Sequence, residues 1–267
     1  MKHSEFQRKI WNYYRAYGRD LPWRRTRDPY KILVSEMMLQ QTQVSRVVDK
    51  YKQFIKQFPD FKALAQSALS DVLIAWQGLG YNRRAKYLHQ TAQKIAKDYN
   101  GKLPFDAVLL QELPGIGKGT VGALLAFAFN IPSVFIETNI RSAYIYHFFK
   151  KKKNVSDTGL MELIEKTVDR KNPREWYYAL MDHGSMLKAT IPNPSRRSAH
   201  HAKQSKFEGS NRQVRGAIIR VLAQNPDVDA AQLAKLIDFS LQCTKISLIQ
   251  LTKEGLIVSV SGRYRLA

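Results

Sequence analysis

The chain has 267 residues, with 43 lysines and arginines against 22 aspartates and glutamates and a formal net charge of +21. With 44% hydrophobic residues it can bury a sizeable core, which predicts one large domain and one small one. Basic residues are in excess throughout the chain, and this favours a polyanionic partner, nucleic acid first and an anionic membrane surface second. The single cysteine, Cys243, excludes an internal disulfide and a cysteine-rich metal site.

No leader and no membrane span are expected. Residues 1–13 are charged and amphipathic, without a continuous apolar run. The longest apolar run, residues 121–136, is interrupted by Asn130 and Pro132 and is too short to cross a bilayer. Together with the single cysteine, these features favour a cytoplasmic, nucleoid-associated protein.

Apolar residues at helical spacing predict an all-helical domain over residues 1–187. The expected helical segments are 6–14, 30–39, 44–58, 63–75, 82–99, 105–112, 120–130, 140–149 and 159–187. No stretch before residue 255 alternates with period two, so no strand is expected there.

Residues 113–119, Leu-Pro-Gly-Ile-Gly-Lys-Gly, form a glycine-rich turn before a helix that begins near Thr120. Gly115, Gly117 and Gly119 allow a tight turn and close approach to another molecule. The N-terminus of the following helix, together with Lys118, favours an anion such as a phosphate. From the residues alone, a plain helix–helix turn and a hairpin that grips phosphates both remain open.

Glu36 stands among apolar residues in the segment Ser-Glu-Met-Met-Leu-Gln-Gln-Thr-Gln. Burial disfavours an ionised carboxyl, and a carboxyl that stays protonated can act as a general acid. A surface glutamate on an amphipathic helix is the commoner arrangement. Gln40, Gln41 and Gln43 at the end of this helix are a solvated terminus in one interpretation, and amides that read base edges or fill a gap in the base stack in the other.

Residues 78–84, Gly-Leu-Gly-Tyr-Asn-Arg-Arg, make a second glycine turn with an aromatic residue at its tip. Tyr81 is a candidate to stack on bases or wedge between them, with Arg83 and Arg84 near the DNA backbone. A tyrosine folded back on the core is the competing interpretation.

The composition changes at residue 188. Residues 188–210 are predicted to be an extended basic linker, and residues 211–267 a second domain of three helices and a β-hairpin, which a winged helix fits best. Such a domain binds DNA or docks on a protein. Its DNA-contacting candidates are Thr244, Lys245, Lys253, Arg263 and Arg265.

Four segments carry a resemblance to a known family: LPWR at 21–24, DPYKILVSEMMLQQTQV at 28–44, GLGYNRRAKYLH at 78–89 and LPGIGKGTVGALL at 113–125. Over residues 5–187 the chain resembles the helix-hairpin-helix (HhH-GPD) DNA glycosylases, in particular the MutY-type adenine glycosylases. The resemblance implies a two-lobed helical fold, a hairpin that holds the DNA backbone, and double-stranded DNA with a mispaired or damaged base as the partner.

The resemblance also implies roles for individual residues. Glu36 matches the glutamate that protonates the flipped adenine and helps to activate water. Glu137 matches the aspartate that stabilises the positive sugar, and Asn139 is expected to support it. Bifunctional relatives have a lysine nucleophile directly before the hairpin threonine, Thr120 here; that position is Gly119, which predicts a monofunctional enzyme that leaves an abasic site.

Three departures from the family pattern bear on function. Glu137 replaces the usual aspartate, and a shift of about 1 Å in a catalytic carboxylate costs on the order of 100-fold in rate unless the backbone compensates. The four cysteines that bind an iron–sulfur cluster are missing, so no cluster and no other cofactor or metal is expected. The second domain does not resemble the Nudix-like domain that inspects 8-oxoguanine.

The leading hypothesis is therefore a monomeric, cluster-free glycosylase that excises a purine, adenine opposite guanine or 8-oxoguanine, with no membrane role. The alternatives are excision of a deaminated base, uracil or hypoxanthine, and a non-catalytic protein that binds DNA or senses lesions.

Overall fold

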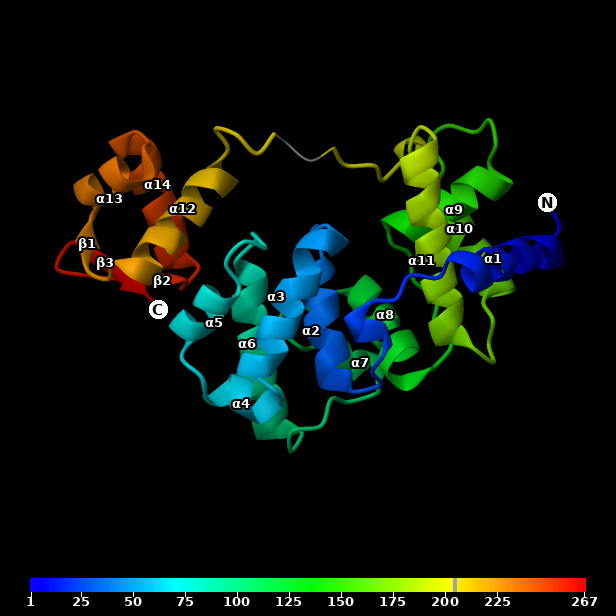
Figure 1. The fold of residues 1–267 in the computed structure, drawn as a ribbon, viewed down its shortest axis with the longest axis horizontal. Coiled ribbons are helices and arrows are strands. Elements are labelled where there is room, and N and C mark those ends of the chain that lie inside the picture. The colour runs from blue at the N-terminus through cyan, green and yellow to red at the C-terminus, as the bar shows by residue number, and fades with distance from the viewer. Residues whose placement is uncertain (204–205) are drawn as a thin grey trace. The chain divides into compact units, whose positions relative to one another are not determined.

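The computed structural model describes residues 1–203 and 206–267, and the chain is mainly helical, as predicted (Figure 1). The first 203 residues contain short 3-10 turns at Pro22–Arg24 (η1) and Pro194–Arg197 (η2). Their α-helices are α1 (His3–Tyr17), α2 (Pro29–Leu39), α3 (Val44–Gln57), α4 (Phe61–Gln66), α5 (Leu69–Ala75), α6 (Arg83–Asp98), α7 (Ala107–Gln111), α8 (Lys118–Phe129), α9 (Thr138–Phe148), α10 (Asp157–Thr167) and α11 (Pro173–Thr190).

The chain folds into two compact units that are not continuous in sequence. The first contains residues 1–32, 105–112 and 116–203, and the second contains residues 33–104, 113–115 and the described C-terminal part from 206 to 267. The predicted division at residues 187 and 210 follows the sequence and stays a prediction. Its linker includes residues 204–205, which lie outside the described part, while residues 188–190 belong to the last turn of α11.

In the first unit, α11 packs against α9 and α1. Aromatic rings fill the space between these helices because their bulky side chains recur on the facing sides: the ring of Phe6 lies 4.9 Å from that of Tyr144 and 6.0 Å from that of Trp176, centroid to centroid. All three side chains are completely buried. This aromatic core fixes the position of the N-terminus of α9.

In the second unit, α6 packs against α4 and α5. Phe54 of α3, Trp76 after α5 and Leu88 of α6 are fully buried, and the rings of Phe54 and Trp76 meet edge to face with centroids 6.0 Å apart. This core supports the end of α2 and the loop between α5 and α6.

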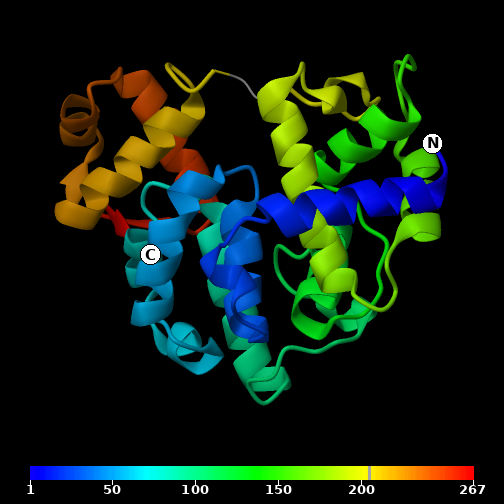
Figure 2. The same ribbon diagram turned by 45° about the vertical axis from the view of Figure 1, so that its right-hand side comes forward.

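The C-terminal part of the second unit contains α12 (Asn211–Gln224), β1 (Val228–Asp229), α13 (Ala230–Ile237), α14 (Leu241–Lys253), β2 (Ile257–Val260) and β3 (Arg263–Leu266). Helices α12 and α14 lie side by side (Figures 1 and 2). The strands form an antiparallel sheet in the order β1-β3-β2, with Val228 opposite Tyr264 and Ile257 opposite Leu266. The three helices and the hairpin were predicted, whereas the two-residue strand β1 was not.

Two expected helical segments are each divided in two. Ser67 interrupts 63–75: its hydroxyl donates to the carbonyl of Leu64 at 2.7 Å, and its own carbonyl lies 3.0 Å from Nε2 of His89 on α6. Segment 159–187 is interrupted where the carboxylate of Asp169 accepts from two following amides, before Pro173 starts α11. Serine and aspartate side chains compete for backbone groups in this way, and proline favours the first position of a helix.

No helix in the described ranges is long and apolar enough to cross a bilayer.

Candidate active site and DNA-binding loops

Glu137 lies at the start of α9, where it caps the helix. Its Oε1 accepts hydrogen bonds from the amides of Asn139 at 2.8 Å and Ile140 at 2.9 Å, and its Oε2 accepts from Nδ2 of Asn139 at 3.3 Å. The first amides of a helix have no partner within it, and the helix dipole is positive there, so a carboxylate is stabilised at this position. The position of the Glu137 carboxylate is thus set by helix capping, an interaction between residues that are close in sequence.

Opposing effects act on the ionisation of Glu137. Burial of the half-buried side chain raises its pKa, while the Ile140 and Asn139 amides and the positive charge of Lys188 lower it, with burial the largest effect. Lys188 lies on the last turn of α11, and burial lowers its own pKa, whereas Glu137 raises it. The charges of Glu137 and Lys188 therefore favour each other's ionised form in a partly desolvated place.

The close approach of α11 to α9 depends on Gly184. A β-carbon built on Gly184 would lie 2.0 Å from the carbonyl oxygen of Asn139, far inside contact distance. The buried Oδ1 of Asn139 has no hydrogen-bond partner among the described residues. Asn139 thus directs its amide nitrogen to Glu137 and retains an acceptor for a water or a ligand.

The glycine-rich hairpin leads into α8 in the same unit as Glu137. Gly117 is the N-cap of α8 and offers no side chain to its first amides, and Gly117, Lys118 and Gly119 are all exposed. A β-carbon on Gly119 would lie 3.8 Å from the carbonyl oxygen of Ile136, the residue before Glu137. The structure therefore brings the start of the hairpin helix next to the backbone that directly precedes Glu137, with room for a side chain at 119.

Gly115, at the hairpin turn, requires the absence of a side chain. Its φ is +76°, and a β-carbon there would lie 2.8 Å from that of Tyr87 on α6. Thr91, also on α6, donates its hydroxyl to the carbonyl of Pro114 at 2.9 Å. The turn residues Leu113–Gly115 are thereby fixed against α6.

The LPWR segment is attached to α11 by a buried ion cluster. Asp182 accepts from Nε and the amide of Arg19 at 2.6 and 2.8 Å, and from both terminal nitrogens of Arg24 at 2.8 and 2.7 Å. The Arg24 guanidinium also lies over the ring of Tyr178, 4.5 Å from its centroid. The contacts of Arg24 in this cluster are structural, and they hold the first turn after α1 in place.

Glu36 belongs to the second unit, on α2. It is half-buried between Ser35 and Met37, both about 1% exposed, and Met38 is fully buried. A glutamate within an apolar helix, with its neighbours buried, matches the prediction for its surroundings.

Arg84 is buried, with 7% of the residue exposed, and serves as a cap for α2. Its Nη1 donates to the carbonyls of Met37, Met38 and Gln40 at 2.6–2.8 Å. Its Nη2 donates to Oγ1 of Thr42 at 3.0 Å and to the carbonyls of Leu79 and Gly80 at 3.2 and 2.9 Å. A cation is stabilised by the carbonyls at a helix C-terminus, even though burial lowers its pKa to about 10.

Arg84 therefore points into the protein. The predicted contact with the DNA backbone would require it to extend toward solvent. Arg84 connects the turn after α2 to the loop before α6. These two segments contain the residues that the sequence predicts to contact bases. Its predicted DNA contact stays untested, and its observed contacts organise the residues around it.

The two connected loops contain backbone conformations that are unusual for residues with side chains. Gln41 is exposed with φ +54°, and Tyr81 is half-buried with φ +49° between Gly80 and Asn82. Such conformations cost about 1–3 kcal/mol each and concentrate at functional sites. Gln40 is half-buried, Gln43 is the exposed N-cap of α3, and exposed Arg83 has its Nε 3.9 Å from Glu254.

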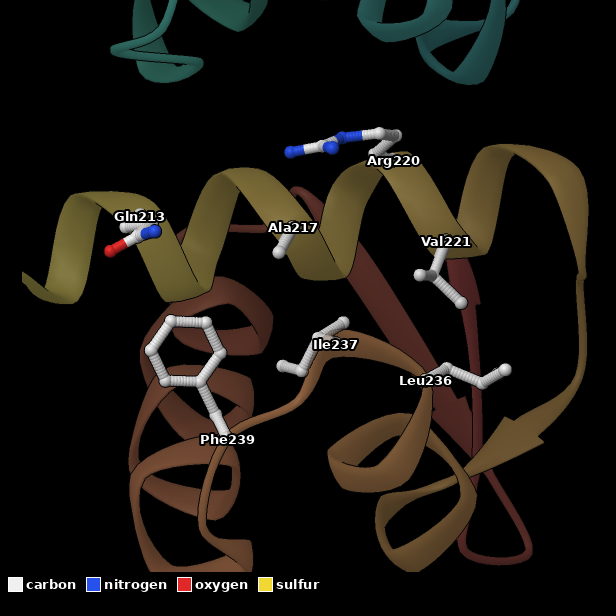
Figure 3. A pocket seen from close by; sticks show the side chains of 7 residues that line it. All are labelled: Gln213, Ala217, Arg220, Val221, Leu236, Ile237 and Phe239. Carbon is white, nitrogen blue, oxygen red and sulfur yellow. The ribbon is translucent and has the colours of Figure 1, made fainter. Parts of the chain in front are cut away.

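In the C-terminal elements, Thr244 is fully buried and donates its hydroxyl to the carbonyl of Ser240 at 3.0 Å. The expectation that Thr244 contacts DNA is therefore wrong, whereas Lys245, Lys253, Arg263 and Arg265 remain candidates. A cavity of about 220 Å³ lies between α12 and the end of α13, and polar Gln213 and Arg220 line it together with apolar side chains (Figure 3). It is smaller than the roughly 300–1,000 Å³ of usual ligand pockets.

Several residues near the candidate site could not be identified from the sequence. Asp182, Gly184 and Lys188 lie on α11, about 50 residues after Glu137 in the chain, and no local motif indicates that they reach α9. Lys188 was assigned to the linker. The one sequence feature that could have indicated its position is the helix that begins at Pro173 and continues past residue 187.

An iron–sulfur cluster does not fit the residues present. The chain has one cysteine, Cys243, which is exposed on α14, and the described ranges contain no cluster of three metal-ligating side chains. A cubane cluster needs four thiolates or their equivalents.

Several known proteins are similar to this chain in sequence or in structure. The adenine DNA glycosylase of Buchnera aphidicola subsp. Baizongia pistaciae is 37% identical over 187 residues, covering 68% of this chain and 52% of the relative. That of Mycobacterium tuberculosis (strain H37Rv) is 43% identical over 130 residues, covering 48% and 43%. The chain thus spans about half the length of the curated relatives that it matches.

Among solved structures, a thermostable thymine-DNA glycosylase is similar with a TM-score of 0.63 and 26% identity, covering 72% of this chain and 90% of that one. Residues 34–170, just over half of the chain, match the family described as HhH-GPD superfamily base excision DNA repair protein. This range includes Glu36, both glycine loops and Glu137. The chain belongs to the HhH-GPD superfamily of base excision DNA repair proteins.

Proposed function

We propose that this protein is a monofunctional DNA glycosylase that hydrolyses the N-glycosidic bond of adenine in a mispair with guanine or 8-oxoguanine. The observation that carries the proposal is the fixed carboxylate of Glu137 at the start of α9, with the hairpin helix beside it in the same unit. The curated relatives that are 37% and 43% identical are adenine DNA glycosylases, which supports adenine as the base.

The chemistry needs two carboxyl groups in different states. Breaking an N-glycosidic bond leaves an oxocarbenium-like sugar, so one carboxyl protonates the leaving base and the other offsets the positive charge. Glu36 takes the first role and also activates the attacking water. Glu137 takes the second, and Asn139, bonded to its Oε2, holds it in position.

The replacement of aspartate by glutamate at 137 is compatible with this role. The side chain does not extend freely, because its Oε1 is bonded to two amides of the same helix turn. The longer side chain therefore folds back on the start of α9, and the backbone rather than the chain length sets the carboxylate position.

DNA is held, in this proposal, by two groups of residues. Gly115, Gly117, Lys118, Gly119 and Thr120 hold a phosphate at the start of α8, where exposed amides and a lysine favour an anion. Gln40, Gln41, Gln43, Tyr81 and Arg83 face the displaced base and its neighbours, and Tyr81 is the wedge. The protein acts as a cytoplasmic monomer on double-stranded DNA, without an iron–sulfur cluster, and residues 211–267 are a winged helix.

A panel of duplexes tests the function. Each carries one candidate lesion, adenine opposite guanine or 8-oxoguanine, uracil, hypoxanthine, or thymine opposite guanine, and alkali then cleaves any abasic site. We expect cleavage at adenine, and its loss in the Glu36→Gln variant with DNA binding retained. Absence of cleavage on every duplex would support a non-catalytic DNA-binding protein instead.

Thymine is the second candidate base, because the structural relative with a TM-score of 0.63 is a thymine-DNA glycosylase. Cleavage at the thymine or uracil duplex and none at adenine would select this alternative. Borohydride treatment during the reaction tests the absence of lyase chemistry, since a Schiff base would be trapped as a covalent adduct. We expect no adduct, because Gly119 provides no amine at the start of α8.

A further inference from the structure

Tyr81, the candidate wedge, is held by a residue from the C-terminal elements. Arg212, the second residue of α12, donates from Nη1 to the Tyr81 hydroxyl at 2.8 Å, and its guanidinium carbon lies 5.5 Å from the centre of the Tyr81 ring. The guanidinium of Arg84 also lies 5.5 Å from this ring. The tyrosine ring is thus in contact with two cations, one from α6 and one from α12.

The contact of Arg212 is one part of a larger interface within the second unit. Lys86 of α6 donates to the carbonyl of Glu254 at the end of α14, and the Glu254 carboxylate pairs with Arg215 of α12 and lies 3.9 Å from Nε of Arg83. Helix α12 and strand β3 also pack against α5. The C-terminal elements are therefore attached directly to the segment that begins at Gly78.

The conformation of the Tyr81 loop explains why it needs such support. Gly78, Gly80 and Tyr81 all have positive φ, of +92°, +71° and +49°. The left-handed conformation of a tyrosine persists only where its surroundings hold it. Hydrogen bonds to charged groups are stronger than neutral ones, so Arg212 is suited to fix the direction of the hydroxyl.

We propose that Arg212 is a positioning residue for Tyr81, so that α12 and the Tyr81 loop form one surface that distinguishes a mispair from paired DNA. The C-terminal elements then contribute to selectivity through a residue that no family motif in this chain includes. The inference rests on the proposed function only in assigning the Tyr81 loop to DNA.

Binding measurements on the full chain test this without using excision as the readout. The probes are a fluorescent duplex with one adenine–guanine mispair and the same duplex fully paired, and the variants are Arg212→Ala, Tyr81→Phe and the double variant. We expect each single variant to lower the preference for the mispair about tenfold, as for loss of a charged hydrogen bond. The double variant is expected to lower it no further, because both changes remove the same contact.

Arg220→Ala is the matched control, since Arg220 is exposed on the same helix. It is expected to weaken binding to both duplexes equally and leave the preference unchanged. Three results would each overturn the proposal. The effects could multiply in the double variant, the preference could stay unchanged in Arg212→Ala, or Arg212→Ala could bind the mispair more tightly. The last result would show that the contact blocks Tyr81. If the binding measurements give the expected pattern but the protein excises no base from any duplex of the panel, only the proposed function would be overturned.

Discussion

At the scale of single residues, Glu137 has an observed structural role and a proposed chemical one. Its Oε1 caps α9, and its Oε2 faces only the amide nitrogen of Asn139 among the described hydrogen bonds. Cap residues that accept backbone amides contribute about 1 kcal/mol to stability. In the proposed function, the hydrogen bonds of Oε1 to the helix therefore orient Oε2, the oxygen that would stabilise the positive sugar.

The Glu137→Gln variant separates these roles. The amide oxygen can still accept from the Asn139 and Ile140 amides, so the free energy of unfolding is expected to fall by about 1 kcal/mol or less. Loss of the negative charge is expected to lower base release by about 100-fold or more. Urea unfolding and single-turnover excision measure the two effects, and an unchanged excision rate would exclude Glu137 from catalysis.

The acidity of Glu137 gives a pH dependence. Burial raises its pKa above the ordinary 4.5, and the ionised form stabilises the sugar, so the excision rate should fall as the pH is lowered through this raised pKa. Lys188→Met removes a cation that lowers the pKa, so the acid limb of the single-turnover pH profile is expected to move to higher pH. Lys166→Met, at an exposed lysine of α10, should leave the limb in place. A shift to lower pH in Lys188→Met would contradict the effect of the Lys188 charge on the pKa of Glu137.

The buried ion cluster around Asp182 is expected to contribute to the free energy of unfolding. Its side chain is 1% exposed and is bonded to Arg19 and Arg24. Removing one partner of a buried pair leaves uncompensated charge, and Asp182→Ala is expected to cost about 3–5 kcal/mol in urea unfolding. Asp20→Ala, which breaks the exposed pair with Arg25, is the control and should change little.

Local motifs in the sequence predicted the apolar surroundings of Glu36, because short spacings determine helix faces. They could not predict Lys188 or Asp182, because these residues reach the site only when α11 packs on α9 and the LPWR segment. The inward position of Arg84 was missed for a similar reason. Two adjacent arginines look alike in sequence, yet Arg83 is exposed and Arg84 is buried one helical position later.

At the scale of elements, α9 and α11 make the closest contact at the candidate site. Helix existence was well predicted from apolar spacing, but the interruptions at Ser67 and at Asp169–Pro173 were not, since apolar residues continue across both. In α14 the buried face consists of Thr244, Ser247, Leu248 and Leu251, at spacings of three and four, so the apolar residues Ile246 and Ile249 are exposed.

The Gly184→Ala variant tests the α9–α11 contact. The new methyl group would lie 2.0 Å from a backbone oxygen, so one helix must shift, at a cost of about 1–3 kcal/mol or more. Excision should fall as well, because the shift displaces Asn139 and with it Glu137. Gly159→Ala is the control: its β-carbon would have only Ser156 Oγ at 3.9 Å, and alanine favours a helix. Equal stability of the two variants would contradict close packing at Gly184.

At the scale of the whole molecule, the net charge of +21 is expected to dominate the proposed interaction with DNA. Neutralising phosphates releases counterions, so the logarithm of the binding constant falls linearly with that of salt concentration. The fold class and the polyanionic partner could be predicted from this charge and from the helical spacing. The grouping of residues 206–267 with residues 33–104 could not, because it depends on surface contacts such as Lys86 with Glu254.

The Lys118→Ala variant tests whether the hairpin contributes one phosphate contact. The slope of the salt dependence is expected to decrease by about 0.9, with affinity reduced alike for paired and mispaired duplexes. Fluorescence anisotropy over a series of salt concentrations measures it. Lys62→Ala, at an exposed lysine of α4 outside the proposed DNA-binding set, is the control. A slope that stays at the wild-type value in Lys118→Ala would remove the hairpin lysine from the interface.

The six bonds of Arg84 have a consequence for protein engineering. Gln40 and Arg84 are 44 positions apart in the chain, yet one guanidinium fixes both the glutamine turn and the tyrosine loop. If the turn alone were transplanted from another member of the superfamily, it would lack its cation. If the loop alone were transplanted, the carbonyls at the end of α2 would be left buried without a hydrogen-bond donor. A chimera that alters base preference must therefore exchange residues 37–42 and 78–84 together.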